Sequence, residues 1–421
     1  SAPPEYRQDS ELDRKELSLF DLALLTWSTT MSSSTPTTRR AAVVHAVAAT
    51  TAILAAIAAP GTASAEDGVT SSEVKLGMAN AQSGPAAGLG VGMKSGAEAY
   101  LARVNAAGGV NGRKLTLVVK DDGYEPAKTA GATEALIGMD KVFALFGYVG
   151  TPTSSAAVPV ASKSQVPYLF PFTGAEFLRN PVNKWVFNVR ASYFDETEAM
   201  VERLTKDVGA KKIAMLMQDD AFGEAVKGGI ARALFKRDMK IAAEARIKRN
   251  SMEVEGGVEA MKAAAPDAIV FVGTYKQMAA AVKKARDSGV TARFLTVSFI
   301  GTENFIAEAG PSGDGVYITQ VMPSPQDASL PIVKSYQGDV KPADQGYTSL
   351  EGYINAAVLV EALKKVGGDP TRASLVAALE GLSADIGGFK VGFSASSHQG
   401  SKAVYLTRVQ GGKAVTQTKI Q

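Results

Sequence analysis

The stretch KVFALFGYVGTPTSSAAVPVASKSQVPYLFPFTGAEFLR, from Lys141 to Arg179, decides how the rest of the chain is interpreted. Its two apolar runs, Val142–Phe146 and Val166–Phe170, have the length and composition of buried parallel strands. Each run ends in a loop of small and hydroxyl-bearing residues that leads into the start of a helix. The stretch therefore predicts two strand–loop–helix units of an α/β fold.

The two loops of this stretch are candidate binding loops. The first contains Thr151 and Thr153, and the second contains Thr173. In an open α/β sheet, ligands bind beyond the carboxyl ends of the strands, where helix N-termini offer unpaired N–H groups. Two such loops could close on one small anionic group. The alternative is that these hydroxyls only cap helices, and the loops by themselves favour that alternative.

The composition is that of an ordinary globular protein, with 421 residues, 46% of them hydrophobic, and a net charge of +3. This length suffices for two domains. The small charge does not indicate a nucleic-acid partner, and we expect none. The sequence contains no cysteine and two histidines, and His45 lies in the N-terminal segment that we expect to be removed, so a single histidine, His398, remains. The mature chain therefore offers no thiolate or His-pair metal site and no cysteine nucleophile. We therefore expect no metal, no cofactor and no enzymatic activity.

The N-terminal segment has the pattern of a secretory signal peptide. Thr37–Arg40 precedes an apolar, alanine-rich run, Ala41–Ala59, which is followed by a cleavage site, Ala63–Ala65. A transmembrane anchor is the alternative, but the run is dominated by alanine and ends in a good cleavage site. We assign residues 31–65 to a signal peptide for Sec export and expect a soluble protein in the periplasm. Residues 1–30 are interpreted as a non-native or mis-assigned extension.

Strand and helix patterns alternate along the remaining chain, which predicts two parallel sheets flanked by helices. No low-complexity linker separates the two halves, so we expect two lobes joined by several short crossings. The expected strands beyond the opening stretch are Glu73–Asn80, Lys114–Lys120, Asn183–Arg190, Lys212–Gln218, Lys240–Ile247, Ala268–Gly273, Arg293–Val297, Gly315–Thr319 and Val404–Val409, the last of them followed by a polar tail.

Two further motifs admit a nucleotide-binding or catalytic interpretation that we do not favour. The glycine run Gly88–Gly92 resembles a dinucleotide fingerprint, but the position of its third glycine is occupied by Met93. We expect these glycines to form a tight loop that lets the backbone approach a ligand closely. Asp121 and Asp122 end a predicted strand, and we expect them to bind loop amides and cap the next helix rather than act as an acid–base pair.

Taken together, the motifs resemble those of the periplasmic solute-binding proteins of ABC transporters, in the leucine/isoleucine/valine-binding (branched-chain amino acid) family. The likeness covers nearly all of residues 73–410. The motifs that carry it are Ser83–Pro85, the segment AAGGVNGRKL (Ala106–Leu115), Asp121-Asp122, Glu125–Ala127, Asp220–Glu224 and Gly273–Tyr275.

This resemblance implies a type I periplasmic-binding fold, an α/β architecture of two doubly wound parallel-sheet lobes joined by a three-crossing hinge. We assign residues 73–190 plus 321–400 to lobe 1 and residues 191–320 plus 401–421 to lobe 2. The implied function is that of a monomeric substrate-binding subunit of an ABC importer, which captures a small carboxylate-bearing solute between the lobes and delivers it to membrane permease and ATPase subunits. An extracytoplasmic ligand sensor with the same clamp fold is the alternative.

The same resemblance implies which residues bind the solute, an amino acid or a related organic acid. Ser298 stands where branched-chain amino acid binders carry a glutamate that pairs with the ligand's ammonium, so a carboxylate without an ammonium fits equally well. Glu303 lies close in sequence, and the pattern does not place it. The matching positions are Thr151 and Thr173 for the ligand carboxylate, Tyr148, Phe172 and Leu89 at the border of the site, and Phe222, Tyr275 and Ser298 from the second lobe.

Overall fold

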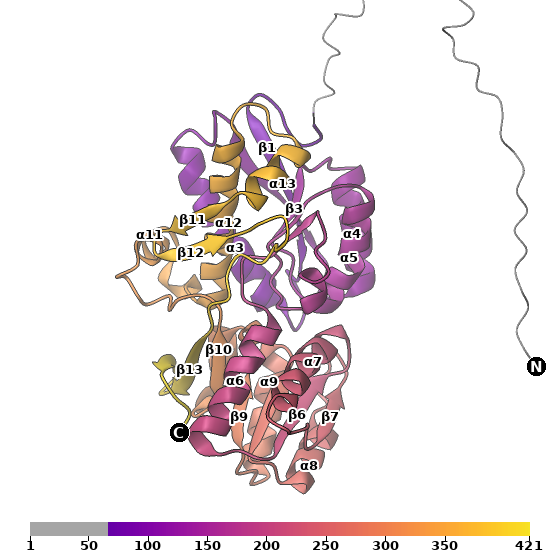
Figure 1. The fold of residues 1–421 in the computed structure, drawn as a ribbon, viewed down its shortest axis with the longest axis vertical. Coiled ribbons are helices and arrows are strands. Elements are labelled where there is room, and N and C mark those ends of the chain that lie inside the picture. The colour runs from indigo at the N-terminus through magenta and orange to yellow at the C-terminus, as the bar shows by residue number, and fades with distance from the viewer. Residues whose placement is uncertain (1–65) are drawn as a thin grey trace, which may run out of the picture. The chain divides into compact units, whose positions relative to one another are not determined.

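The structure is a computed structural model that describes residues 66–421 (Figure 1). The expected extension, residues 1–30, and the expected signal peptide, residues 31–65, lie outside the described residues. Within residues 66–421, none of the helices combines the length and the apolar character that a membrane crossing requires.

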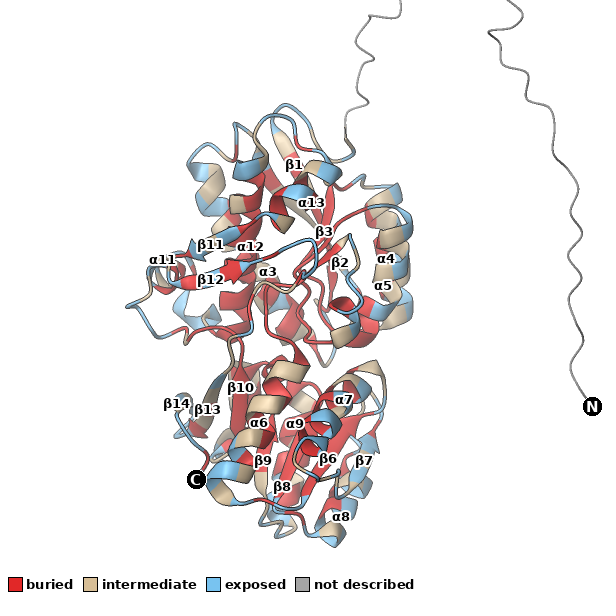
Figure 2. Ribbon diagram, in the orientation of Figure 1, coloured by how far each residue is buried: buried red, intermediate tan, exposed pale blue. Residues whose placement is uncertain are grey.

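The first lobe is built on a five-stranded sheet in which all strands run parallel, in the order β2-β1-β3-β4-β5. Helices and a small hairpin surround this sheet, so its strands are buried (Figure 2). The strands are β1 (Glu73–Asn80), β2 (Lys114–Asp121), β3 (Ala144–Phe146), β4 (Tyr168–Leu169) and β5 (Val186–Phe187). The other elements are α3 (Ala87–Ala106), α4 (Pro126–Gly138), α5 (Thr151–Lys163), α11 (Pro331–Asp339), α12 (Tyr347–Val366), α13 (Arg372–Glu380), β11 (Ser383–Ile386) and β12 (Phe389–Gly392).

The second lobe is built on a seven-stranded sheet in the order β14-β13-β10-β9-β8-β6-β7. The five strands from β10 to β7 in this order run parallel to one another. At the other edge, β13 and β14 are antiparallel. The strands are β6 (Ile213–Gln218), β7 (Glu244–Ile247), β8 (Ala268–Val272), β9 (Arg293–Thr296), β10 (Tyr317–Gln320), β13 (Tyr405–Gln410) and β14 (Lys413–Gln417). The helices are α6 (Tyr193–Val208), α7 (Ala221–Phe235), α8 (Glu255–Ala264), α9 (Tyr275–Asp287) and α10 (Thr302–Ala309), with the short 3-10 turn η2 (Ser298–Ile300) after β9.

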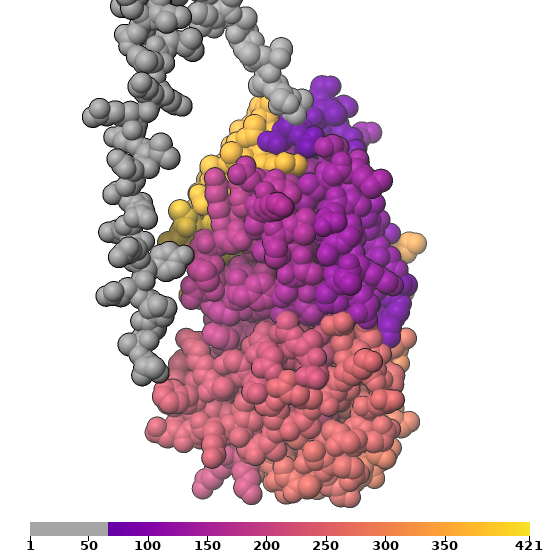
Figure 3. Space-filling model, turned by 90° about the vertical axis from the view of Figure 1, so that its right-hand side faces the viewer, coloured from indigo at the N-terminus to yellow at the C-terminus, as the bar shows by residue number. Residues whose placement is uncertain are grey.

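The chain passes between the two sheets three times: between β5 and α6, after β10, and between β12 and β13. This arrangement confirms the predicted type I periplasmic-binding fold. The predicted boundaries of the two lobes stay a prediction. The lobes are in contact on the face shown in Figure 3, and Arg249 of the second lobe forms an ion pair of 2.9 Å with Glu125 of the first.

Two predictions of local structure are wrong. The run Gly88–Gly92 is not a loop but the first turns of α3. A Cβ atom on Gly90 would lie 1.8 Å from the backbone oxygen of Ala81, so this glycine permits a close approach between two segments of the chain rather than to a ligand. The predicted polar tail contains β14, which pairs with β13. The exposure of this edge strand on one side explains its polar sequence.

The aspartate pair binds loop amides as expected, but it does not cap the next helix, because Glu125 is the N-cap residue of α4 and no side chain accepts from the N–H groups of its first turn. Asp122 accepts hydrogen bonds from the backbone N of Tyr124 at 2.8 Å and from the hydroxyl of Thr129 at 2.9 Å. Asp121 accepts from three loop amides, those of Gln82, Ser83 and Gly123. Burial raises the pKa of Asp122 to about 6. Both carboxylates therefore fix the loop between β2 and α4.

Helices α3 and α12 pack closely because glycines lie at their contact. A Cβ atom on Gly96 of α3 would lie 1.7 Å from the backbone oxygen of Ser349 in α12. A Cβ atom on Gly352 of α12 would lie 2.2 Å from the backbone oxygen of Met93. Helix α12 is buried along most of its length (Figure 2), so a separation of the two helices would disturb the core of the first lobe.

We expect Gly96→Ala to lower the free energy of unfolding by about 3 kcal/mol, because the added methyl group forces the two backbones apart. The matched control is Gly131→Ala in α4, where a Cβ atom would meet nothing within 4 Å. That substitution should raise stability by about 0.5–1 kcal/mol, as replacement of a helical glycine does. Urea unfolding of both variants measures the difference, and similar stabilities would contradict the close packing.

Candidate functional site

Thr151 and Thr173, which the sequence places in separate loops, lie against each other in the structure. Their hydroxyl oxygens are 2.7 Å apart, and both side chains are buried. Thr151 is the first residue of α5, and Gly150 before it has a φ of 109°, a value that favours glycine. The hydroxyl of Thr173 also donates to the hydroxyl of Tyr193 at 3.4 Å. The pair therefore lies at a helix N-terminus, where backbone N–H groups and hydroxyls suit an anion.

Aromatic rings from both lobes gather beside this threonine pair. Phe299, in η2 of the second lobe, is the centre, with ring centroids 4.5 Å from Phe222, 5.4 Å from Phe172 and 6.0 Å from Tyr124. Tyr193 packs on Phe222 at 5.4 Å. We call these five residues the aromatic cluster. All are buried, and they provide the apolar surroundings that a hydrophobic solute requires.

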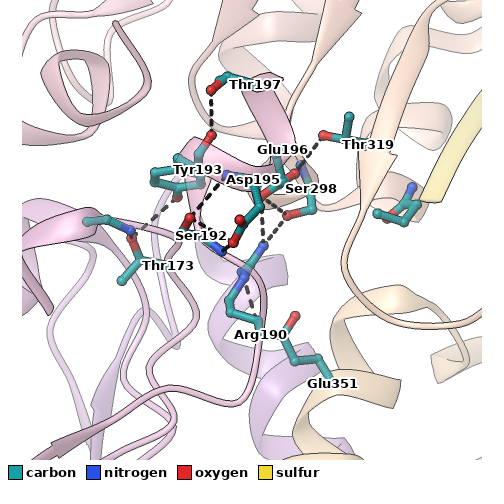
Figure 4. A network of polar contacts seen from close by, with 12 residues as sticks. Thr173, Arg190, Ser192, Tyr193, Asp195, Glu196, Thr197, Ser298, Thr319 and Glu351 are labelled. Carbon is teal, nitrogen blue, oxygen red and sulfur yellow. Dashed lines mark hydrogen bonds and ion pairs between the residues drawn. The ribbon is translucent and has the colours of Figure 1, made fainter. Parts of the chain in front are cut away.

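A buried arginine lies next to the aromatic cluster (Figure 4). Arg190, in the crossing between β5 and α6, has its guanidinium carbon 4.7 Å from the centroid of the Phe172 ring. Its Nη2 atom donates to the hydroxyl of Ser298 and lies 3.6 Å from Glu196. Its Nη1 atom lies 3.6 Å from Glu351 of α12. Arg190 thus connects a carboxylate of each lobe.

The carboxylate of Glu196 is held by several donors of the second lobe. It accepts from the backbone N of Ser298 at 2.8 Å, from the hydroxyl of Ser298 at 3.0 Å and from the hydroxyl of Thr319 at 2.6 Å. We call Arg190, Glu196, Ser298, Thr319 and Glu351 the Arg190 network (Figure 4).

Burial governs the charges of this network. It raises the pKa of Glu196 and raises the pKa of Glu351 to about 7, while the nearby Arg190 cation acts in the opposite direction. The Nε and Nη1 atoms of Arg190 are buried without a hydrogen-bond partner in the described part of the chain. An anionic group that reached this guanidinium would find Nε as a donor, while Nη1 faces the carboxylate of Glu351 at 3.6 Å.

Three of the expected binding residues make contacts away from the threonine pair. The hydroxyl of Tyr148 lies 3.1 Å from that of Thr133 in α4, so this side chain points into the first lobe. The hydroxyl of Tyr275 accepts from the backbone N of Gly88 at 3.1 Å and joins α9 to α3 across the lobes. Leu89 is buried and packs against Gly301, since a Cβ atom added to Gly301 would lie 2.4 Å from the Cδ2 atom of Leu89. The structure therefore brings together Thr151, Thr173, Phe172, Phe222 and Ser298.

Sequence reasoning missed the three charged residues of the network, although each carries a signal. Glu196 lies on the apolar face of α6, which also includes Met200 and Leu204. Glu351 is the first acid in the long buried run of α12, and Arg190 follows the short apolar strand β5. A charge in an apolar pattern indicates a buried pair or a site. In residues 66–421, no group of three metal-ligating side chains could hold a metal ion.

The fold and this site define a two-lobed binding protein. The chain belongs to the periplasmic binding protein family, which matches residues 73–414. The predicted likeness to leucine/isoleucine/valine-binding proteins is confirmed.

Known proteins with similar sequence or structure support this membership. The chain is 24% identical over 326 residues to the leucine-, isoleucine-, valine-, threonine-, and alanine-binding protein of Pseudomonas aeruginosa, covering 76% of this chain and 85% of that protein. A possible leucine/isoleucine/valine-binding protein from Rhodopirellula baltica matches with 33% identity and a TM-score of 0.79, over 85% of this chain and 98% of that chain. A substrate-binding periplasmic protein from Ralstonia solanacearum matches with 28% identity and a TM-score of 0.77, over 82% and 100%.

Proposed function

We propose that this protein is the secreted substrate-binding subunit of an ABC importer, active in the periplasm, and that it captures a small carboxylate-bearing solute between its lobes. The observation that carries this proposal is the pairing of Thr151 with Thr173 at the start of α5, where a helix N-terminus offers N–H donors to an anion. The adjacent aromatic cluster would hold the apolar part of the solute.

The Arg190 network favours a solute without an ammonium group. Glu196 and Glu351 both lie 3.6 Å from Arg190, and Glu196 already accepts three hydrogen bonds from Ser298 and Thr319. A ligand ammonium would have to compete with Arg190 for these acids. The names of the relatives support an amino acid instead, so both classes of solute belong in the test.

The test is native mass spectrometry of the purified protein, followed by a thermal-shift screen of paired amino acids and organic acids. Phenylalanine and 3-phenylpropanoate form one such pair, and leucine and 4-methylpentanoate another. At about 100 times its dissociation constant, a true ligand should add about 2.7 kcal/mol of stability. We expect the acids without ammonium to give the larger shifts. Shifts with leucine but with none of the simple carboxylates would contradict the preference, and no shift with any carboxylate would contradict the proposal.

Transport and catalysis are tested separately. If the protein serves an importer, loss of its gene should abolish uptake of the solute that the screen identifies. We propose no enzymatic role, so the bound solute should be recovered chemically unchanged after long incubation. Stoichiometric product formation would contradict that assignment.

A further inference from the structure

Glu303, which the sequence could not place, lies away from the threonine pair, at a second contact between the lobes. It belongs to α10 of the second lobe, and its Oε2 atom accepts a hydrogen bond of 3.0 Å from the backbone N of Tyr347, the first residue of α12 in the first lobe. A Cβ atom on Gly346 would lie 2.5 Å from this same oxygen, so the carboxylate fits closely against the start of α12.

A cavity of about 760 Å³ adjoins Glu303. This volume falls in the range of small-molecule sites. None of the eight predicted binding residues and no member of the Arg190 network lines it. Its walls come from α10, the crossing after β10, the start of α12, the β13–β14 turn and β14, with these lining residues: Glu303, Ile306, Ala307, Ser324, Pro325, Gln326, Tyr347 and the segment 412–416.

The charge of Glu303 is uncompensated. Within residues 66–421, no lysine, arginine or histidine forms an ion pair with its carboxylate, although Lys413 also lines the cavity. Burial raises the pKa of Glu303 to about 7, and the hydrogen bond from Tyr347 acts in the opposite direction. Glu303 is half-buried, and a carboxylate in this setting would be stabilised by a cation placed within hydrogen-bond distance.

The remaining walls of the cavity are largely apolar. Ile306 and Pro325 contribute aliphatic surface, and Val415 of β14 is 39% exposed beside them. An aliphatic or aromatic body would gain by covering this surface. A ligand with an ammonium at one end and an apolar body at the other would therefore match the walls of this cavity.

We propose that this cavity is a second binding site, which takes an amphiphilic monocation with its ammonium on Glu303 and its apolar part against Ile306, Pro325 and Val415. Because both lobes contribute walls, the occupant contacts both and favours the arrangement of lobes in which the cavity exists. The site would therefore couple a cation to the capture of the solute by reciprocal linkage.

The test uses 2-phenylethylammonium as the probe and 2-phenylethanol as its uncharged counterpart, titrated calorimetrically into the intact protein at pH 8. We expect the ammonium to bind at least about tenfold more tightly than the alcohol, as one charge-assisted hydrogen bond allows. Glu303→Gln should remove this preference. Equal binding of the two probes, or no binding of the ammonium, would overturn the proposal.

Two further variants keep the result interpretable if Glu303→Gln is poorly folded. Ala307 is exposed at the cavity, and Ala307→Phe should block the probe while the thermal midpoint stays unchanged. Thr151→Val/Thr173→Val should bind the probe like the unmodified protein, because those threonines do not line the cavity. Loss of the probe in the threonine variant together with its retention in Ala307→Phe would place the ammonium in the other site and overturn the proposal.

The pH dependence gives an independent check. Glu303 must be ionised to pair with an ammonium, and its pKa of about 7 means that it takes up a proton as the pH falls from 8 to 5.5. The affinity for 2-phenylethylammonium should therefore fall by about tenfold or more over this interval. The pKa of Tyr347 is raised to about 12, so this hydroxyl keeps its proton throughout. An affinity that is constant between pH 5.5 and pH 8 would contradict the role of Glu303.

Discussion

Replacement of Arg190 by methionine is expected to lower the free energy of unfolding by about 3–5 kcal/mol, because Glu196 and Glu351 would stay buried without their cation. Both acids lie 3.6 Å from the guanidinium, and all three side chains are almost fully buried. Ser298 and Thr319 would still donate to Glu196, but Glu351 has a carboxylate oxygen that accepts no hydrogen bond in the described part of the chain. Glu351 should therefore account for much of the loss.

The loss of stability in Arg190→Met should depend on pH. The raised pKa values of the two acids determine the direction of this dependence. An acid whose pKa is higher in the folded protein than in the unfolded chain favours folding at low pH, and this contribution disappears as the pH rises through the folded pKa. For Glu351 that interval runs from 4.5 to about 7. Without Arg190 the folded pKa values should rise further, so Arg190→Met should cost less at pH 5 than at pH 8. A loss that is equal at both pH values would contradict this account.

Arg246→Met is the matched control. Arg246 also pairs with several carboxylates, at 2.8 Å from Asp219 and 2.7 Å from Glu244, but these groups lie at the protein surface. Exposed ion pairs contribute about 0–1 kcal/mol. Urea unfolding of both variants at pH 5 and pH 8 should therefore show a large, pH-dependent loss only for Arg190→Met.

Most strands and most helices could be predicted because their signals are local, whereas β11, β12 and β14 were not expected. The strand Glu73–Asn80 has the predicted bounds, since Val74, Leu76 and Met78 alternate with other residues and polar turns border the strand. The start of α3 is not apparent from the sequence because Gly88, Gly90 and Gly92 disfavour a helix by propensity, whereas the close approach of Gly90 to the backbone of Ala81 requires a glycine there. That packing is tertiary and leaves no periodic signal in the sequence.

The candidate site could be predicted from the sequence only in part, for a similar reason. Thr151 and Thr173 follow neighbouring strands, so their convergence could be expected from the topology alone. The partners of Ser298 could not, because Arg190 and Glu196 lie 108 and 102 residues away in the sequence and meet Ser298 only through tertiary packing. Contacts across large sequence separations are set by packing rather than by local pattern.

Removal of both threonine hydroxyls should weaken binding of the solute more than any other small change in the chain. Thr151→Val with Thr173→Val keeps the shape of both side chains, and the two hydroxyls that lie 2.7 Å apart are lost together. Loss of both partners of their shared hydrogen bond is nearly neutral for folding, but the hydroxyl of Tyr193 and the backbone N of Ala175 also bond to Thr173 and lose that partner. We therefore expect a loss of about 1–3 kcal/mol in stability and a larger loss in affinity.

The size of this effect distinguishes a binding pair from helix caps. If each hydroxyl donates to a ligand carboxylate, the double variant should lose about 3–6 kcal/mol, which is about 10²- to 10⁴-fold in affinity for the acid that stabilises the protein most in the screen. Ser155→Ala is the control, because this hydroxyl also lies in α5 but donates to the backbone oxygen of Thr151 at 3.0 Å. We expect it to bind the acid like the unmodified protein. If the two threonines only order α5, the double variant should instead unfold more easily while its affinity stays within a few-fold of normal.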